Sequence, residues 1–146
     1  MKYVTEAFIC LREMLCDDFK SVFPVILTDN GTEFDDPTSI EFSHITGEKE
    51  ASLFYCDPNC SWQKGAIERN HEFIRYILPK GTSFAGLTQE QCDLITDHIN
   101  SVPRVSLNGY TPYEVGLIYL GKEKMDKLDF KPIPRDEVNL SIRLIK

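Results

Sequence analysis

The sequence has no long hydrophobic run. Its longest apolar stretch, Val22 to Leu27, is interrupted by Pro24 and is much shorter than a membrane span. The N-terminus also lacks the basic segment followed by an apolar one that marks a secretory signal. We therefore expect a soluble, cytoplasmic protein with no membrane partner.

Basic residues are also few, since 16 Lys and Arg stand against 23 Asp and Glu and give a net charge of −7. This balance argues against a dedicated nucleic-acid coat protein or a membrane-surface binder. It does not exclude an enzyme that acts on DNA, because sites that hold divalent metals concentrate carboxylates. The 5 cysteines are odd in number and follow no secretory signal, which predicts reduced thiols rather than a disulfide framework.

What is present is the composition of a folded domain: 146 residues, 42% of them hydrophobic and 27% charged. Hydrophobic periodicity and capping residues predict an α/β order of elements. In chain order these are a helix over residues 4–19, a buried parallel strand over 25–27, a short helix after residue 37, a strand over 51–55, and helices over 66–78, 88–102 and 111–120. The alternating pattern of residues 138–144 predicts an edge strand.

Two acidic residues stand where an α/β protein places its ligands. Asp29 follows the first strand directly, and ligands of such sheets bind beyond the carboxyl ends of the strands. Spacings of four and three residues place four charged residues on one face of the helix over 66–78 and the turn before it: Lys64, Glu68, Glu72 and Arg75. A strand-end aspartate facing a helix glutamate offers the oxygen ligands of two-metal phosphoryl transfer. An ordinary turn and a solvated helix face remain open alternatives.

The sequences around these acids are more specific than their spacing. LTDNGTEF at residues 27–34 and SWQKGAIERN at residues 61–70 resemble the second and third acidic motifs of DDE transposases and retroviral integrases. The resemblance is closest to the bacterial insertion sequence 30 family. LNGYTPYEV at residues 107–115 is similar to the segment that follows the catalytic residues in that group. Together the three motifs extend over most of residues 23–120.

The resemblance implies a partial ribonuclease H-like fold of the α/β class, which lacks the first three strands and keeps two short parallel strands with flanking helices. Residues 1–121 would form a truncated integrase-type catalytic core, and residues 122–146 a C-terminal extension. In the family the first catalytic aspartate lies on the opening strand, whereas residues 4–19 here already match the helix that follows. The catalytic trio is therefore expected to be incomplete, with little or no catalysis by this chain alone.

The resemblance also implies roles for individual residues. Asp29 and Glu68 would be catalytic and would bind Mg²⁺ or Mn²⁺, weakly in this chain. The residues implied to bind DNA are Lys64, Gly65, Arg69 and Arg75. The implied reaction is metal-dependent DNA cleavage and strand transfer at transposon ends and target DNA, in the cytoplasm and nucleoid of a bacterium. Two strands leave an exposed edge, so we expect the chain to associate with itself or with intact transposase.

Three functions are compatible with these observations. The first is a fragment of a DNA transposase that performs DNA integration. The second is a catalytically inactive remnant that acts by binding intact transposase or DNA. The third is an unrelated α/β binding domain.

Several side chains also have two interpretations. Glu72, one helical turn along, could replace Glu68 as the metal ligand, although the motif register favours Glu68. Arg69 and Arg75 could form only salt bridges with Glu72 on their own helix. The three histidines are expected at surface or boundary positions: His44, His71 and His98.

Overall fold

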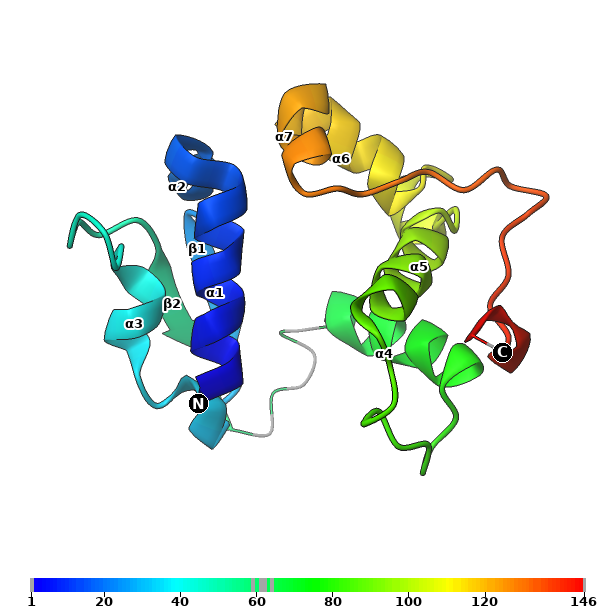
Figure 1. Ribbon diagram of the computed structural model, residues 1–146, viewed down its shortest axis with the longest axis horizontal. Helices are drawn as coiled ribbons and strands as arrows, with labels where there is room; N and C mark the ends of the chain where they lie inside the picture. Colours follow the sequence, from blue (N-terminus) through cyan, green and yellow to red (C-terminus); the bar gives the residue numbers. More distant parts are fainter. Residues whose placement is uncertain (1, 59, 61–62, 64, 146) are drawn as a thin grey trace. The chain divides into compact units, whose positions relative to one another are not determined.

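The computed structural model describes residues 2–58, 60, 63 and 65–145. The chain divides into two compact units, Met1–Gly65 and Ala66–Lys146, which are described separately. The α/β class is confirmed, because two parallel strands are flanked by helices (Figure 1). No helix in the described residues combines the length and the apolar character needed to cross a membrane. The predicted division after residue 121 stays a prediction.

The first unit contains α1 (Lys2–Leu15), α2 (Phe19–Val22), β1 (Val25–Thr28), α3 (Pro37–Glu41) and β2 (Ser52–Tyr55). The second is built from α4 (Gly65–Ile77), α5 (Gln89–Asn100), α6 (Pro112–Leu120) and α7 (Lys122–Lys127). Short 3₁₀ helices cover Cys16–Asp18, Thr32–Phe34, Val105–Leu107 and Ile142–Ile145. The helix predicted over 4–19 is broken at Cys16, whose φ of 50° lies in the left-handed region.

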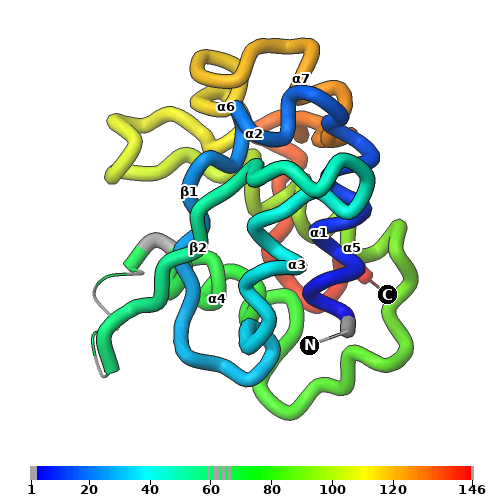
Figure 2. Tube along the Cα trace, turned by 90° about the vertical axis from the view of Figure 1, so that its left-hand side faces the viewer, coloured from blue at the N-terminus to red at the C-terminus, as the bar shows by residue number. Residues whose placement is uncertain are grey.

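The two strands run parallel in a register that pairs Val25 with Ser52 and Thr28 with Tyr55 (Figure 2). Their carboxyl ends are tied together, since the Cys56 N–H donates to the Thr28 carbonyl at 2.7 Å. The Asn30 side-chain amide donates to the Cys56 carbonyl at 3.1 Å. These bonds confirm that the Asp-Asn-Gly turn closes a parallel strand.

A buried arginine organises the first unit. The Arg12 guanidinium donates from Nε to Glu50 at 2.8 Å and also donates to the carbonyls of Ser39 and Ile40. It lies 4.5 Å from the ring centroid of Phe19, which is fully buried. A buried charge is tolerated when its donors are satisfied in this way. Arg12 therefore joins α1, α3 and the segment that precedes β2.

One face of the sheet is left open, and the predicted burial of the first strand is wrong for two of its residues. Val25 is 61% exposed and Leu27 43%, and Phe54 on β2 is 54% exposed. Side chains alternate along a strand, so Val25 and Leu27 share one face, whereas Thr28 lies on the other face and is buried. Among the described strands, β1 pairs with β2 alone, so its second edge is unpaired. An apolar face beside a free edge favours association with another chain.

We predict that this face drives self-association of the chain. The double variant Val25→Thr, Phe54→Thr should weaken association by about 1–2 kcal/mol, because it removes apolar area from the contact. Sedimentation velocity over a concentration series measures this change. Tyr119→Thr, which alters an exposed aromatic residue of α6, is the control and should leave association unchanged. A purely monomeric chain that also melts cooperatively would contradict the prediction.

The second unit is organised around an apolar core between α4 and α5. Its buried members are Phe73, Ile77, Leu78, Ile95 and Ile99. Burial of a side chain of this size contributes about 1.5–3 kcal/mol. Partly buried residues of the C-terminal tail also pack on this core, Leu140 and Leu144 among them. The tail is thus part of the second unit.

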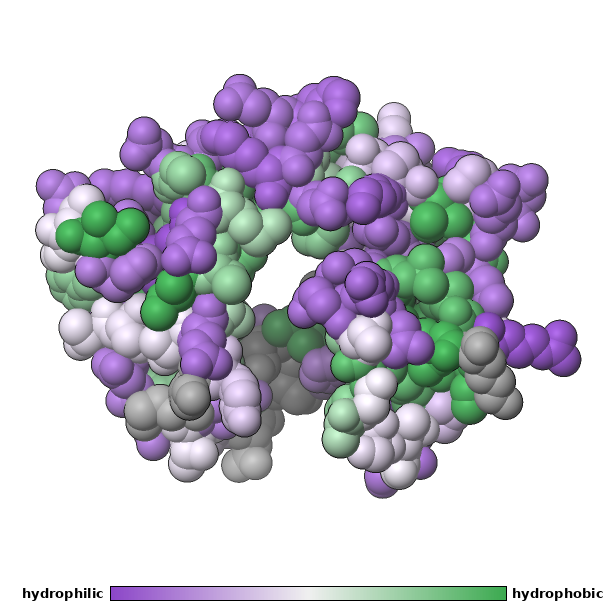
Figure 3. All heavy atoms as spheres, in the orientation of Figure 1, coloured by the Kyte–Doolittle hydropathy of each residue, from purple (hydrophilic) through white to green (hydrophobic). Residues whose placement is uncertain are grey.

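Helix α7 was not predicted, because its sequence KEKMDK shows no apolar periodicity. Lys122 pairs with Asp126 at 2.7 Å, one helical turn along, which supports an exposed helix. Its one buried residue, Met125, packs against Gly116 of α6. A Cβ atom at position 116 would clash with the Met125 side chain, so glycine permits this contact. The surface over α7 is otherwise hydrophilic (Figure 3).

The tail beyond α7 crosses α5 without regular structure until Ile142 (Figure 1). Three buried side chains at and just after the C-terminal end of α5, which we call the α5 clasp, accept hydrogen bonds from main-chain N–H groups of the tail: Asp97 from Lys131 (2.9 Å), His98 from Asn139 (3.1 Å), and Ser101, the residue that follows the helix, from Ile133 (2.8 Å). Side chains therefore accept the main-chain hydrogen bonds that the carbonyls of a neighbouring strand would accept in a β-sheet.

Two expectations about this region are wrong. Residues 138–144 form no strand: the Asn139 N–H donates to His98, and the N–H groups of Arg143 and Leu144 donate to Ser141. His98 is not a surface or boundary residue but is buried, and burial lowers the pKa of its imidazole. To accept the Asn139 N–H, Nδ1 of His98 must be unprotonated.

We predict that acidification weakens the second unit through His98. The unfolded chain takes up a proton near the ordinary histidine pKa of about 6.5, whereas the folded unit resists it. The stabilisation by neutral His98 is therefore complete above pH 6.5 and declines as the pH falls towards the lower folded-state pKa. Urea unfolding between pH 7.5 and 5.5 measures the free energy of unfolding.

The control for this experiment is His98→Gln, in which the amide oxygen can still accept the Asn139 N–H. Burial raises the pKa of Asp97. Its contribution to the free energy of unfolding therefore has the opposite pH dependence to that of His98 and declines as the pH rises. Because Asp97 is present in both proteins, the difference between them isolates His98. Equal pH dependence in the two proteins would refute the assignment.

Candidate active site

Asp29 lies directly after β1, as the sequence predicted, and it is exposed. The hydroxyl of the buried Thr28 donates to the Asp29 carbonyl at 2.9 Å. Together with the bonds to Cys56, this contact fixes the main chain of the turn at the end of the sheet. The position suits a strand-end ligand.

Glu68 lies in the first turn of α4 and is exposed. The opposite side of α4 packs into the core through Phe73 and Ile77, which turns the charged residues to solvent. Ile67, the residue before Glu68, is 39% exposed and is therefore not part of this core.

Glu72, the alternative ligand, is already engaged by its own helix. The Tyr76 hydroxyl donates to Glu72 at 3.0 Å, and the Arg69 guanidinium pairs with the same carboxylate. These hydrogen bonds, that of Tyr76 first, lower the pKa of Glu72. Glu68, in contrast, has no hydrogen-bond or ion-pair partner in the described part of the chain. The geometry therefore favours Glu68 as the carboxylate available to a cation.

The residues expected to bind DNA differ in their surroundings. Arg69 forms a salt bridge with Glu72, as the alternative to DNA binding predicted. Arg75 has no acidic partner among the described residues. Gly65 begins α4, and no described atom lies within 4 Å of a Cβ placed there. Lys64 lies outside the described residues. A role in DNA binding stays a prediction for all four.

Arg104 is a cationic neighbour that the sequence did not reveal. The guanidinium carbons of Arg69 and Arg104 each lie 5.2 Å from the ring centroid of Phe73. Burial, and then the charge of Arg69, lower the pKa of Arg104, and its buried Nε has no hydrogen-bond partner among the described residues. Nothing in the local sequence, where Arg104 follows Pro103, marks this position. The two arginines therefore place positive charge around Phe73 of α4.

Asp29 belongs to the first unit and Glu68 to the second. The described residues contain no group of three His, Cys, Asp or Glu side chains that could hold a metal ion. A shared metal between Asp29 and Glu68 therefore stays a prediction. Each carboxylate is nevertheless of the oxygen type that Mg²⁺ and Mn²⁺ prefer.

Comparison with known proteins relates the chain to transposases. It is 39% identical over 75 residues to the transposase for insertion sequence element IS1086 of Cupriavidus metallidurans, a match that covers 51% of this chain and 21% of that protein. It is 34% identical over 95 residues to the transposase for IS4351 of Bacteroides fragilis, covering 65% and 28%. It is 38% identical over 76 residues to the transposase InsI for IS30A of Escherichia coli, covering 52% and 19%.

The chain is a relative of insertion-sequence transposases. This confirms the resemblance inferred from the three motifs, over about half to two thirds of the chain. The chain spans between 19% and 28% of the length of these relatives. No protein-family model matches it, and no solved structure shows a significant match.

We predict that the pKa of Tyr76 depends on its hydrogen bond to Glu72. The hydrogen bond to Glu72 raises the pKa of Tyr76 above its ordinary value, so Glu72→Gln should return that pKa towards about 10. Site-resolved NMR of labelled tyrosine over an alkaline titration measures it. Glu68→Gln is the matched control and should leave Tyr76 unchanged. A shift of equal size in both variants would contradict this description of the α4 face.

Proposed function

We propose that this chain is part of the catalytic core of an insertion-sequence transposase, with a ribonuclease H-like fold. The complete enzyme would cleave DNA and transfer strands during transposition. Water, and then a freed 3′-hydroxyl, would attack DNA phosphodiesters. The similarity to three insertion-sequence transposases is the observation that carries this proposal.

In this proposal Asp29 and Glu68 are the second and third acidic residues of a DDE site. The fixed turn after β1 supports the first role, and the second is supported by Glu68, whose carboxylate has no partner among the described residues. Two carboxylates about 5 Å apart repel by roughly 3 kcal/mol at an effective dielectric of 20. A divalent cation would relieve this repulsion and, when bound, neutralise charge that develops on a phosphate.

DNA would be the partner, held at its phosphates by the cations of α4. Arg75 is the strongest candidate, because no described acidic side chain competes for it. Arg69 would have to exchange its salt bridge with Glu72 for a phosphate. An exposed pair of this kind is weak, so the exchange costs little.

An inactive binding partner of intact transposase is the second candidate function. Two carboxylates leave a metal with one protein ligand fewer than the DDE trio provides, and the described residues contain no group of three metal-ligating side chains. The exposed sheet face and free edge of β1 offer a surface for an intact subunit. The coding sequence immediately upstream separates the candidates, because an in-frame strand with an aspartate points to the active enzyme.

We predict that Asp29→Asn or Glu68→Gln abolishes strand transfer when placed in the intact transposase that contains this segment. Each change removes a carboxylate charge while keeping the side-chain size, so the fold should persist. A strand-transfer assay with Mg²⁺ or Mn²⁺ measures activity, and thermal melting checks the fold.

Glu72→Gln is the control for this experiment, since Glu72 is held by Arg69 and Tyr76 and should not bind the metal. It should retain strand transfer. Normal transposition by either the Asp29 or the Glu68 variant would end the assignment of the DDE roles.

A further inference from the structure

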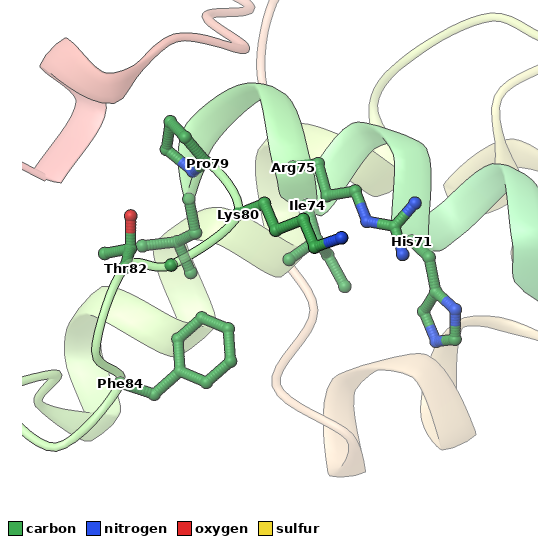
Figure 4. A pocket seen from close by; sticks show the side chains of 9 residues that line it. His71, Ile74, Arg75, Pro79, Lys80, Thr82 and Phe84 are labelled. Atoms are coloured by element: carbon green, nitrogen blue, oxygen red, sulfur yellow. The ribbon is translucent and has the colours of Figure 1, made fainter.

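A pocket of about 490 Å³ lies within the second unit, at the C-terminal end of α4 (Figure 4). Its volume is in the range of about 300–1,000 Å³ that is usual for small-molecule sites. Ile74 of α4, Leu78 directly after the helix and Phe84 of the following loop give it an apolar lining. Phe84 is 61% exposed, so one side of its ring remains available to a ligand.

The loop after α4 is built to present a lysine at this pocket. The Thr82 N–H donates to the Pro79 carbonyl at 3.0 Å, which closes a β-turn. Gly81, at the third position of the turn, has a φ of 92°, the value that a type II turn requires and that glycine adopts without strain. Lys80 thereby occupies the second position of a rigid turn and lines the pocket.

The charged groups of the pocket have one sign. Arg75 and Lys80 line it and have no acidic partner in the described residues, and His71 adds a hydrogen-bonding ring. In Figure 4 the charged ends of Arg75 and Lys80 point towards the side of His71, and Phe84 stands opposite. In a chain of net charge −7, this pair of cations makes a local site for an anion.

We propose that this pocket binds an unpaired nucleotide of DNA, with the base on Phe84 and the adjoining phosphate on Arg75 and Lys80. This inference rests on the proposed function, which gives the chain DNA as its ligand. An aromatic face beside a positively charged groove is the combination that holds single strands, because every base can stack and every phosphate is anionic. A base that is paired inside a duplex could not reach Phe84, so the site favours frayed or single-stranded DNA ends.

The test uses the full chain and a fluorescent single-stranded oligonucleotide of about 12 nucleotides. Anisotropy should show binding that Phe84→Ala weakens between about fivefold and a hundredfold, the range of base stacking on an aromatic ring. Phe84→Tyr, which keeps an aromatic ring, should retain binding. Because Phe84 is exposed, Phe84→Ala should melt like the unaltered chain.

Salt dependence tests the phosphate contacts. Arg75→Gln and Lys80→Gln should each lower the slope of log affinity against log salt by about 0.7, the contribution of one phosphate on a single strand. Lys20→Gln, with the same change of charge in the first unit, is the control and should keep the slope. Tyr119→Ala is the control for an exposed aromatic residue.

The inference is overturned if single strands do not bind, if the two controls weaken binding as much as the pocket variants, or if polyglutamate binds better than the oligonucleotide. A failure here is separable from failure of the proposed function. If Phe84→Ala binds single strands normally while Asp29→Asn abolishes strand transfer in the intact enzyme, the pocket assignment alone is wrong. If the carboxylate variants transpose normally, the proposed function is wrong whatever the oligonucleotide does.

Discussion

The packing of α4 against α5 is the interaction on which the candidate chemistry of the second unit depends. Burial of Phe73 and Ile77 fixes the rotation of α4 about its axis, and this rotation decides which residues meet solvent. Glu68 is exposed for that reason, and so is Arg75. A looser core would allow α4 to rotate about its axis. The apolar packing of α4 against α5 therefore determines which charged residues of α4 are exposed.

Charge is distributed unevenly over that surface. The chain is acidic overall, yet Arg69, Arg75, Lys80 and Arg104 all belong to the second unit and lie on or near α4. On the same helix Glu72 neutralises Arg69, whereas Glu68 has no partner in the part of the chain that the structure describes. Net charge is therefore a poor guide to the local field that a nucleic acid would meet.

Local signals predicted most of the helices and strands, and distant contacts account for the failures. Capping residues marked two helix starts correctly, since Thr88 and Thr111 form complete capping boxes. Residues 138–144 alternate like a strand, but a strand needs a partner, and the partner here is a set of α5 side chains. The burial of His98 and the position of Arg104 depend on the same tertiary contacts, which no local pattern encodes.

The α5 clasp accepts hydrogen bonds from main-chain groups of the tail and not from its side chains. Two of the three N–H groups that it binds belong to residues 131 and 133, and the intervening and following positions are Pro132 and Pro134, which have no N–H to satisfy. Proline is therefore compatible with positions 132 and 134, but not with positions 131 and 133, whose N–H groups form hydrogen bonds. The path of this segment therefore depends on its main chain, and side chains other than proline at residues 131 and 133 would leave these two hydrogen bonds in place.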